Sequence, residues 1–335
     1  MIVLFMYKKT LKYIGISVFA MAAIYLIGPR PHYEKFDDKP KELDVPLGEL
    51  DQYIEKGESQ TLNIKEDNQA EIIWADSIQK TEYSIVYIHG YSASKGEGEP
   101  IHKNMAKKYG CNLYLPRLSK HGLTDEDAFL TLTPRSLVES AKEAIAIGKL
   151  IGEKVILMGT STGGTLSIYL AANEPSVQGL ILMAPNIDIA DQGSHLLNKP
   201  WGKQMMQIMN GGAYRTWEAD EVVQKYWTNK NRIEGLVVLR ELLDNTMTDD
   251  VFQKINVPVC MIVYYKNDQE QDGVVSVEAM DSFLEKISTP QEKVVFKKDP
   301  NANCHPLGSK YTNENWMDVQ VVVDDFFRQV ILSHR

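Results

Sequence analysis

The chain has 335 residues, of which 44% are hydrophobic and 24% are charged, a composition typical of a globular protein with a sizeable core. Its formal net charge of -9 argues against nucleic acids and anionic membrane surfaces as partners. The 3 cysteines form no Cys-x-x-Cys or His/Cys cluster, which excludes a disulfide framework and gives no sign of a metal site.

The N-terminal segment, residues 1–28, differs from everything that follows. Lys8, Lys9 and Lys12 precede a charge-free run of about 16 residues, from Tyr13 to Gly28. A basic flank before an apolar run is typical of a secretory signal or a signal anchor, and the absence of a clear cleavage site favours an uncleaved anchor. A buried N-terminal helix is the remaining alternative. Under the positive-inside rule, the anchored chain would place its main domain outside the cytoplasm.

Residues 29–60 have the Pro-rich, charged composition of a linker and end in a short amphipathic helix, "VPLGELDQYIEKGESQ". From residue 61 onward, β-prone apolar runs alternate with amphipathic helical patterns, which predicts an α/β fold with a mainly parallel, doubly wound sheet and helices on both faces. The predicted strands are 61–64 and 71–75, paired as a hairpin, then 83–90, 111–118, 154–159, 177–185, 257–265 and 292–298. The predicted helices are 99–110, 133–152, 165–175, 276–288 and 315–335.

A long interval interrupts this alternation. About 70 residues separate Pro185 from Val257, whereas connections in α/β units commonly have about 2 to 6. The interval is rich in methionine and aromatic residues, a composition that favours a lid over a pocket, although some of these side chains should simply pack onto the body. We therefore expect a core made of residues 61–185 and 251–335, with a helical lid inserted at 186–250.

The stretch "MGTSTGG" indicates a nucleophilic serine. Ser161 lies between Gly159 and Gly163, directly after a predicted strand and before a predicted helix. Glycines at these two positions permit a very tight strand-to-helix turn that exposes the serine at its tip. Gly-rich turns after strands also bind phosphate, so the motif alone does not establish catalysis.

A serine hydroxyl needs a histidine base, and the base in turn needs a carboxylate that orients it. Of His195, His305 and His334, the histidines after Ser161, only His305 falls in a loop between a predicted strand and the last helix. For the acid, we prefer Asp272, which begins a turn directly before a helix, over Asp268, which lies nearer to the end of the preceding strand. A third possibility is that this acidic loop is only a solvated surface.

Two backbone N–H groups are expected to hold the oxyanion of the reaction intermediate. One belongs to Thr162, directly after the serine. The other belongs to Tyr91 in "IHGYSAS", where Gly90 allows the chain to turn. We interpret His89 in the same stretch as a structural residue rather than a second base.

These motifs, in this order, resemble the α/β-hydrolase fold family over residues 61–333. "IHGYSAS", "PRLSKHGL" and "GTSTGG" are most similar to the branch that contains monoacylglycerol lipases, carboxylesterases and serine aminopeptidase-like hydrolases. In "KHGL", Lys120 stands where that branch has the first glycine of a Gly-His-Gly motif. The resemblance implies a structural role for His121 and a lid at the place where the insertion occurs.

Together, these motifs and the family resemblance predict a serine hydrolase that cleaves a carboxylic ester of short to medium acyl chain, or a monoacylglycerol. Ser161, His305 and Asp272 would form the triad, and no metal or cofactor is required. The expected partners are a small acyl substrate and, through residues 1–28, a membrane. The alternatives are an amidase, peptidase or acyltransferase that uses the same triad, and a catalytically inactive fold that serves as an anchored binding protein.

Overall fold

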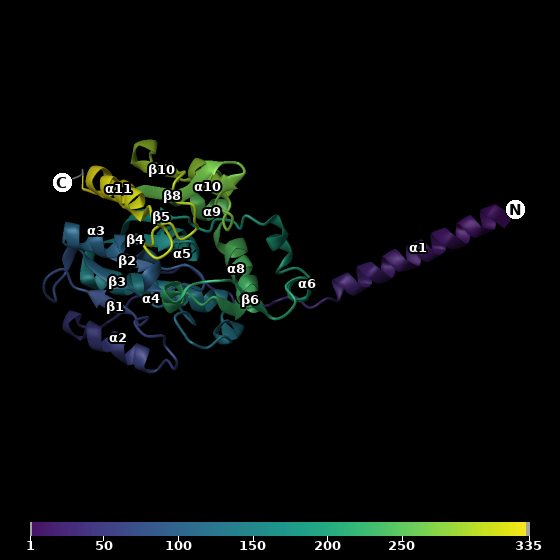
Figure 1. The fold of residues 1–335 in the computed structure, drawn as a ribbon, viewed down its shortest axis with the longest axis horizontal. Coiled ribbons are helices and arrows are strands. Elements are labelled where there is room, and N and C mark those ends of the chain that lie inside the picture. Colours follow the sequence, from purple (N-terminus) through teal and green to yellow (C-terminus); the bar gives the residue numbers. More distant parts are fainter. Residues whose placement is uncertain (1, 333–335) are drawn as a thin grey trace.

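A computed structural model describes residues 2–332 and shows a mainly parallel sheet flanked by helices, as predicted (Figure 1). In the described residues, the neighbouring strands run in the order β1-β3-β2-β4-β5-β8-β10, and the short β9 pairs with β8. All of these pairs are parallel except β1–β3 and β8–β9. The strands are β1 (Glu71–Ile73), β2 (Thr81–Ile88), β3 (Asn112–Leu115), β4 (Gly152–Thr160), β5 (Val177–Met183), β8 (Val259–Asn267), β9 (Glu270–Gln271) and β10 (Val294–Asp299).

Helices cover both faces of this sheet (Figure 1). On one side, α3 lies beside the C-terminal helices, where the ring of Tyr109 stacks on Phe327 at 4.4 Å between ring centroids. On the other, α4 and α5 contact each other and the central strands. The helices are α3 (Ile101–Tyr109), α4 (Pro134–Ile151), α5 (Thr162–Ala171), α10 (Val277–Lys286) and α11 (Trp316–Phe326), with a final π-helical turn at Phe327–Ile331.

Local sequence signals explain where two of these helices begin and end. The hydroxyl of Thr133 accepts a hydrogen bond from the N–H of Ser136, and Pro134 occupies the first helical position, so α4 begins with a capping box. Helix α3 ends at Gly110, whose φ of 63° is the left-handed conformation that glycine adopts without strain. Both boundaries agree with the predicted ones.

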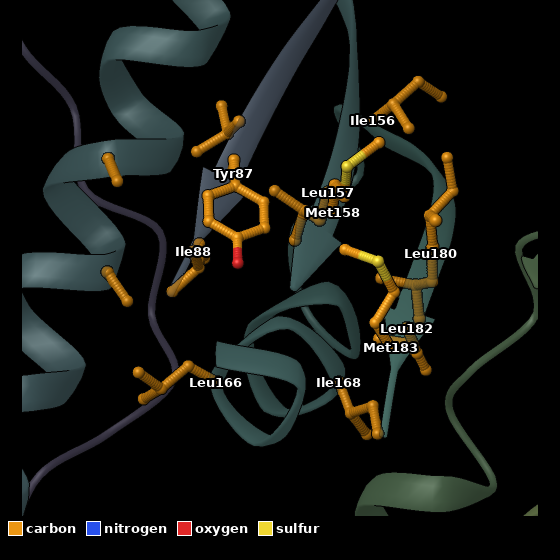
Figure 2. Close-up of a cluster of buried hydrophobic side chains, with 14 of the residues drawn as sticks. Tyr87, Ile88, Ile156, Leu157, Met158, Leu166, Ile168, Leu180, Leu182 and Met183 are labelled. Carbon is orange, nitrogen blue, oxygen red and sulfur yellow. The ribbon is translucent and has the colours of Figure 1, made fainter. Parts of the chain in front are cut away.

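The core extends over the whole sheet, and Figure 2 shows the part of it in which apolar side chains of β2, β4, β5 and α5 meet. The central strands are buried on both faces, as expected for parallel strands covered by helices on each side. Residues of this cluster include Tyr87, Ile88, Ile156, Leu157, Met158, Leu166, Ile168, Leu180, Leu182 and Met183.

The predicted N-terminal hairpin is wrong. Residues 61–64 form no strand and make only an isolated bridge, between Ile64 and Leu123. Strand β1 instead pairs antiparallel with β3 at the sheet edge. Residues 61–64 are β-prone, but no tight two-residue turn connects them to β1. Strand β1 therefore pairs with the free edge of β3 instead.

The N-terminal segment forms α1 (Ile2–Leu26), which extends away from the body in Figure 1. None of the helices in residues 2–332 combines the length and the hydrophobicity that a membrane span requires. The membrane anchor and the export of the main domain stay predictions.

The predicted linker lies along α4 before the short helix α2 (Leu50–Ser59), which forms as predicted. Four ion pairs join this stretch to α4, with distances of 2.6 to 2.8 Å between the charged atoms. They connect Glu34 with Arg135, Asp37 with Lys142, Lys41 with Glu143, and Glu42 with Lys149.

The inserted residues 186–250 contain helices and also a small two-stranded antiparallel sheet, β6–β7, which the sequence did not indicate. Helix α8 contacts α4 and α5 and thereby fastens the insertion to the body. The elements are α6 (Gly202–Met209), β6 (Tyr214–Thr216), α7 (Glu221–Tyr226), β7 (Lys230–Arg232), α8 (Ile233–Thr246) and the start of α9 (Asp249–Phe252).

Candidate active site

Ser161 occupies the turn between β4 and α5. Its φ of 52° and ψ of -119° form a strained conformation that non-glycine residues rarely adopt. A Cβ atom on Gly163 would lie 1.8 Å from the carbonyl oxygen of Ile88, and one on Gly159 would lie 2.7 Å from the backbone of Gly163. The turn therefore requires both glycines, which is the steric reason for the sequence motif.

Asp272 and His305 lie in contact at the same carboxyl edge of the sheet. Asp272 follows β9 and His305 follows β10, and His305 Nδ1 lies 2.7 Å from Asp272 Oδ2. The other carboxylate oxygen, Oδ1, accepts hydrogen bonds from the N–H groups of Val274 and Val275, at 2.8 and 3.1 Å. The carboxylate of Asp272 is thus held in one orientation, with one oxygen directed at the imidazole.

The electrostatics of this pair favour a negative Asp272 and a more basic His305. Burial opposes the ionisation of Asp272, but His305 and the N–H groups of Val274 and Val275 outweigh burial and lower its pKa. Burial likewise disfavours the charged imidazole, yet Asp272 outweighs this effect and raises the pKa of His305. An imidazole in this setting is a stronger base than a free one.

The structure brings Asp272, and not Asp268, to the histidine. Asp268 is exposed and accepts a hydrogen bond from the hydroxyl of Tyr265 at 2.7 Å. His195 lies in the insertion, 3.4 Å from Asp188, and His334 lies outside the described residues.

The second ring nitrogen of His305 is available for proton transfer. Nε2 is buried and, among the described residues, it has no hydrogen-bond partner, so its bond to Ser161 Oγ is not formed here. Hydrogen bonds between catalytic groups are often long before substrate binds. Only 7% of Ser161 is exposed, so the site is largely covered.

The loop after β2 lies directly against the serine. A Cβ atom on Gly90 would be 3.0 Å from Ser161 Cβ, and Tyr91 is the next residue. The hydroxyl of Tyr91 donates to Asn231 Oδ1 in the insertion at 3.0 Å, which fixes the side chain. Thr162 is the first residue of α5, where a backbone N–H has no partner within the helix. The role of these two N–H groups as oxyanion donors stays a prediction.

His89 and His121 have structural contacts, as expected. Both nitrogens of His89 are engaged, with Gly90 O at 3.0 Å and with the N–H of Leu118 at 3.1 Å. Burial lowers the pKa of His89 to about 3 and that of His121 to about 4, so both rings are neutral at physiological pH. His121 Nδ1 lies 2.8 Å from Ser119 O.

Sequence reasoning missed Glu97. Only 2% of this residue is exposed, and its carboxylate accepts a hydrogen bond from the N–H of Gly90 at 2.5 Å. Burial raises the pKa of Glu97 to about 7. The available signal was the sequence "KGEG", in which an acid stands between two glycines a few residues after the predicted oxyanion loop.

In the part of the chain that the structure describes, no group of three or more His, Cys, Asp or Glu residues could hold a metal ion. Of the three cysteines, Cys111 and Cys260 are buried, and Cys304 is half-buried.

Comparison with known proteins places this geometry in context. The model of the family described as serine aminopeptidase, S33, matches residues 79–296. A thermostable monoacylglycerol lipase from Bacillus sp. (strain H-257) is 24% identical over 213 residues, which cover 63% of this chain and 79% of the lipase.

Two solved structures share the fold. A structure described for LipS and LipT, two metagenome-derived lipolytic enzymes, has a TM-score of 0.64 at 13% identity and covers 80% of this chain and 100% of its own. Est1E from Butyrivibrio proteoclasticus with bound ferulic acid has a TM-score of 0.52 at 17% identity and covers 78% of this chain and 95% of its own.

Proposed function

Because the chain belongs to the serine aminopeptidase S33 family of α/β-hydrolases and is an enzyme of the hydrolase class, we propose that it cleaves a carboxylic ester of short to medium acyl chain, or a monoacylglycerol. The family resemblance seen in the sequence is confirmed. The observation that carries the proposal is the hydrogen-bonded pair of Asp272 and His305 at the sheet edge where Ser161 occupies a strained turn.

In the proposed reaction, Ser161 Oγ attacks the acyl carbonyl while His305 Nε2 takes its proton. Asp272 holds the imidazole and stabilises its charged form. The N–H groups of Tyr91 and Thr162 bind the oxyanion, and the imidazolium then gives its proton to the leaving alcohol. Water, activated by the same histidine, hydrolyses the acyl-enzyme and restores Ser161.

An apolar acyl group is favoured by the insertion, for which we propose the role of a lid. The site beneath it is largely covered, and contacts such as the Tyr91–Asn231 hydrogen bond join the insertion to the oxyanion loop. Helix α6 of the insertion also exposes Met205, Ile208 and Met209, which suits contact with an apolar substrate. The monoacylglycerol lipase relative supports the same substrate class.

The proposal extends to the location of the enzyme, which we place outside the cytoplasm with residues 1–28 as its membrane anchor. The basic residues at the start of this segment and the exposed apolar side chains along α1 support this part. Deleting residues 2–28 should move the protein from the membrane fraction to the soluble fraction, as measured by immunoblotting of fractionated cells. An unchanged distribution would contradict the anchor.

The test of the function uses the full chain, a fluorophosphonate probe and a series of p-nitrophenyl esters. We expect one adduct, mapped to Ser161 by mass spectrometry and absent in His305→Ala. Ester turnover in Ser161→Ala should fall by about 10⁶-fold, because the nucleophile and its base act as a unit.

Three outcomes would contradict the proposal. Turnover that survives in Ser161→Ala would exclude the serine as nucleophile. A folded wild-type chain without adduct or turnover would favour a binding protein. Faster cleavage of matched anilides than of esters would favour the amidase or peptidase alternative.

A further inference from the structure

Glu97 is buried because two glycines let its segment pass between aromatic rings. It lies in the short helical turn η2 (Lys95–Gly98), in which all four residues are buried. A Cβ atom on Gly96 would lie 2.2 Å from the ring of Tyr226, and one on Gly98 would lie 2.5 Å from the ring of Tyr87. Side chains at these two positions would collide with the rings, so the buried position of this turn requires both glycines of "KGEG".

The carboxylate of Glu97 is held by hydrogen bonds from β2 and from the loop that follows it. Oε2 accepts hydrogen bonds from the N–H of Gly90, in the predicted oxyanion loop, and from the hydroxyl of Tyr87, in β2, at 2.5 and 3.2 Å. The buried side chain of Trp227, in the insertion, lies close enough to lower the pKa of this carboxyl group. These groups favour the negative form of Glu97, but burial outweighs them and raises its pKa to about 7.

Glu97 also lies next to the nucleophile. A single point, the Cβ position of Gly90, is 2.9 Å from Glu97 Oε1 and 3.0 Å from Ser161 Cβ, so one backbone unit separates the acid from the serine. The hydroxyl of Tyr87 lies 3.0 Å from the hydroxyl of Thr160, which directly precedes Ser161. The acid is therefore linked to the serine turn from two directions.

We infer that Glu97 is a positioning residue that holds the Gly90–Tyr91 loop against Ser161. Its negative form also favours the charged form of His305, in addition to the effect of Asp272. This inference rests on the proposed function, because a loop position and a histidine charge matter only if the serine reacts. The imidazole of His305 is hydrogen-bonded to Asp272 and not to Glu97. Glu97 therefore acts on His305 only through the electrostatic attraction between their charges.

The charged groups around His305 determine the sign of the effect. Asp272 and Glu97 raise the pKa of His305, and Arg215, in β6, lowers it. Removing the negative charge of Glu97 must therefore lower the pKa of His305. Because His305 accepts a proton only when it is neutral, the acid limb of the activity profile should then move to lower pH.

The groups that face Glu97 add no competing charge. Tyr87 is protonated at physiological pH because burial, and then Glu97, raise its pKa. His102, packed edge-on against the Tyr87 ring, is neutral because burial lowers its pKa to about 4. Glu97 itself has a pKa of about 7, so in the wild type its negative charge develops around neutral pH.

The experiment compares the pH profiles of kcat and kcat/KM for an ester in four full-length proteins: wild type, Glu97→Gln, Glu97→Asp and Glu99→Gln. Glu99 is the matched control, since it lies two residues away and its carboxylate forms ion pairs with Lys103 and Lys310. Circular dichroism melting confirms that each variant is folded.

In Glu97→Gln, the acid limb of kcat/KM should shift downward by about 0.5 to 1 pH unit, because one charge near the imidazole is gone. The value of kcat should fall by about 10- to 100-fold with little change in KM, because the loop loses its anchor. Glu97→Asp should keep the wild-type limb but lose kcat, since it retains the charge on a shorter side chain. Glu99→Gln should match the wild type.

A limb that does not move in folded Glu97→Gln, or a wild-type kcat in Glu97→Asp, overturns the inference. An NMR titration of the His305 imidazole in wild type and Glu97→Gln provides the same test without substrate, and an unchanged pKa overturns it as well. Failure of the proposed function has a different signature, namely ester turnover that persists in Ser161→Ala.

Discussion

The two halves of the candidate site are assembled in different ways. On the nucleophile side, Gly159, Ser161 and Gly163 lie within one turn, and contacts inside that turn and with β2 fix its shape. On the histidine side, Asp272 and His305 are 33 residues apart and meet because β8 and β10 are parallel neighbours. The nucleophile side depends on steric contacts between adjacent residues, and the histidine side depends on the pairing of two strands in the sheet.

This difference predicts different consequences of mutation. A change on the nucleophile side that adds atoms should disturb folding, because the backbone of the turn has no free space. A change on the histidine side that preserves size should leave the fold intact and disturb the chemistry, because the loops only need to present two side chains to each other.

The largest effect in this comparison is expected from Asp272→Asn. The substitution preserves the shape but removes the charge that orients His305 and stabilises its imidazolium, so kcat should fall by about 10⁴-fold. Steady-state kinetics with an ester substrate measure this loss, and thermal melting should remain near that of the wild type.

Asp268→Asn is the matched control, since Asp268 is an exposed acid four residues earlier whose carboxylate accepts a hydrogen bond from Tyr265 and does not contact His305. Its turnover should equal that of the wild type. If Asp268→Asn is crippled and Asp272→Asn is not, the acid has been assigned to the wrong residue.

The features that the sequence predicted are those with a local cause. The capped start of α4 at Thr133, the glycine end of α3 at Gly110 and the turn around Ser161 each depend on a few adjacent residues. Asp272 could be preferred over Asp268 because it begins a turn before a helix.

The features that the sequence did not reveal depend on contacts between distant segments. β1 found its partner at the edge of β3 rather than in the preceding run, and the linker acquired ion pairs with α4 that no composition rule anticipates. Glu97 belongs to the same class, because an isolated acid in a loop is ordinarily solvated. Only the packing of Tyr226 and Tyr87 around its flanking glycines buries it beside the site.

A smaller effect, on stability rather than on turnover, is expected from Gly163→Ala. The added methyl group would meet the carbonyl oxygen of Ile88 at 1.8 Å, and neither backbone can move without displacing β2 or α5. The free energy of unfolding, measured by urea denaturation, should therefore fall by more than about 3 kcal/mol.

Gly57→Ala is the control for this substitution, because Gly57 lies within α2 with no heavy atom within 4 Å of its Cβ position. There the methyl group only restricts the unfolded chain, so stability should stay constant or rise by about 0.4 to 1 kcal/mol. If Gly163→Ala were as stable as Gly57→Ala, the turn would have room to relax, and the strained φ of Ser161 could not be attributed to the crowding between β2, β4 and α5. If Gly163→Ala lowers the free energy of unfolding and Gly57→Ala does not, this crowding fixes the conformation of Ser161 before any substrate binds.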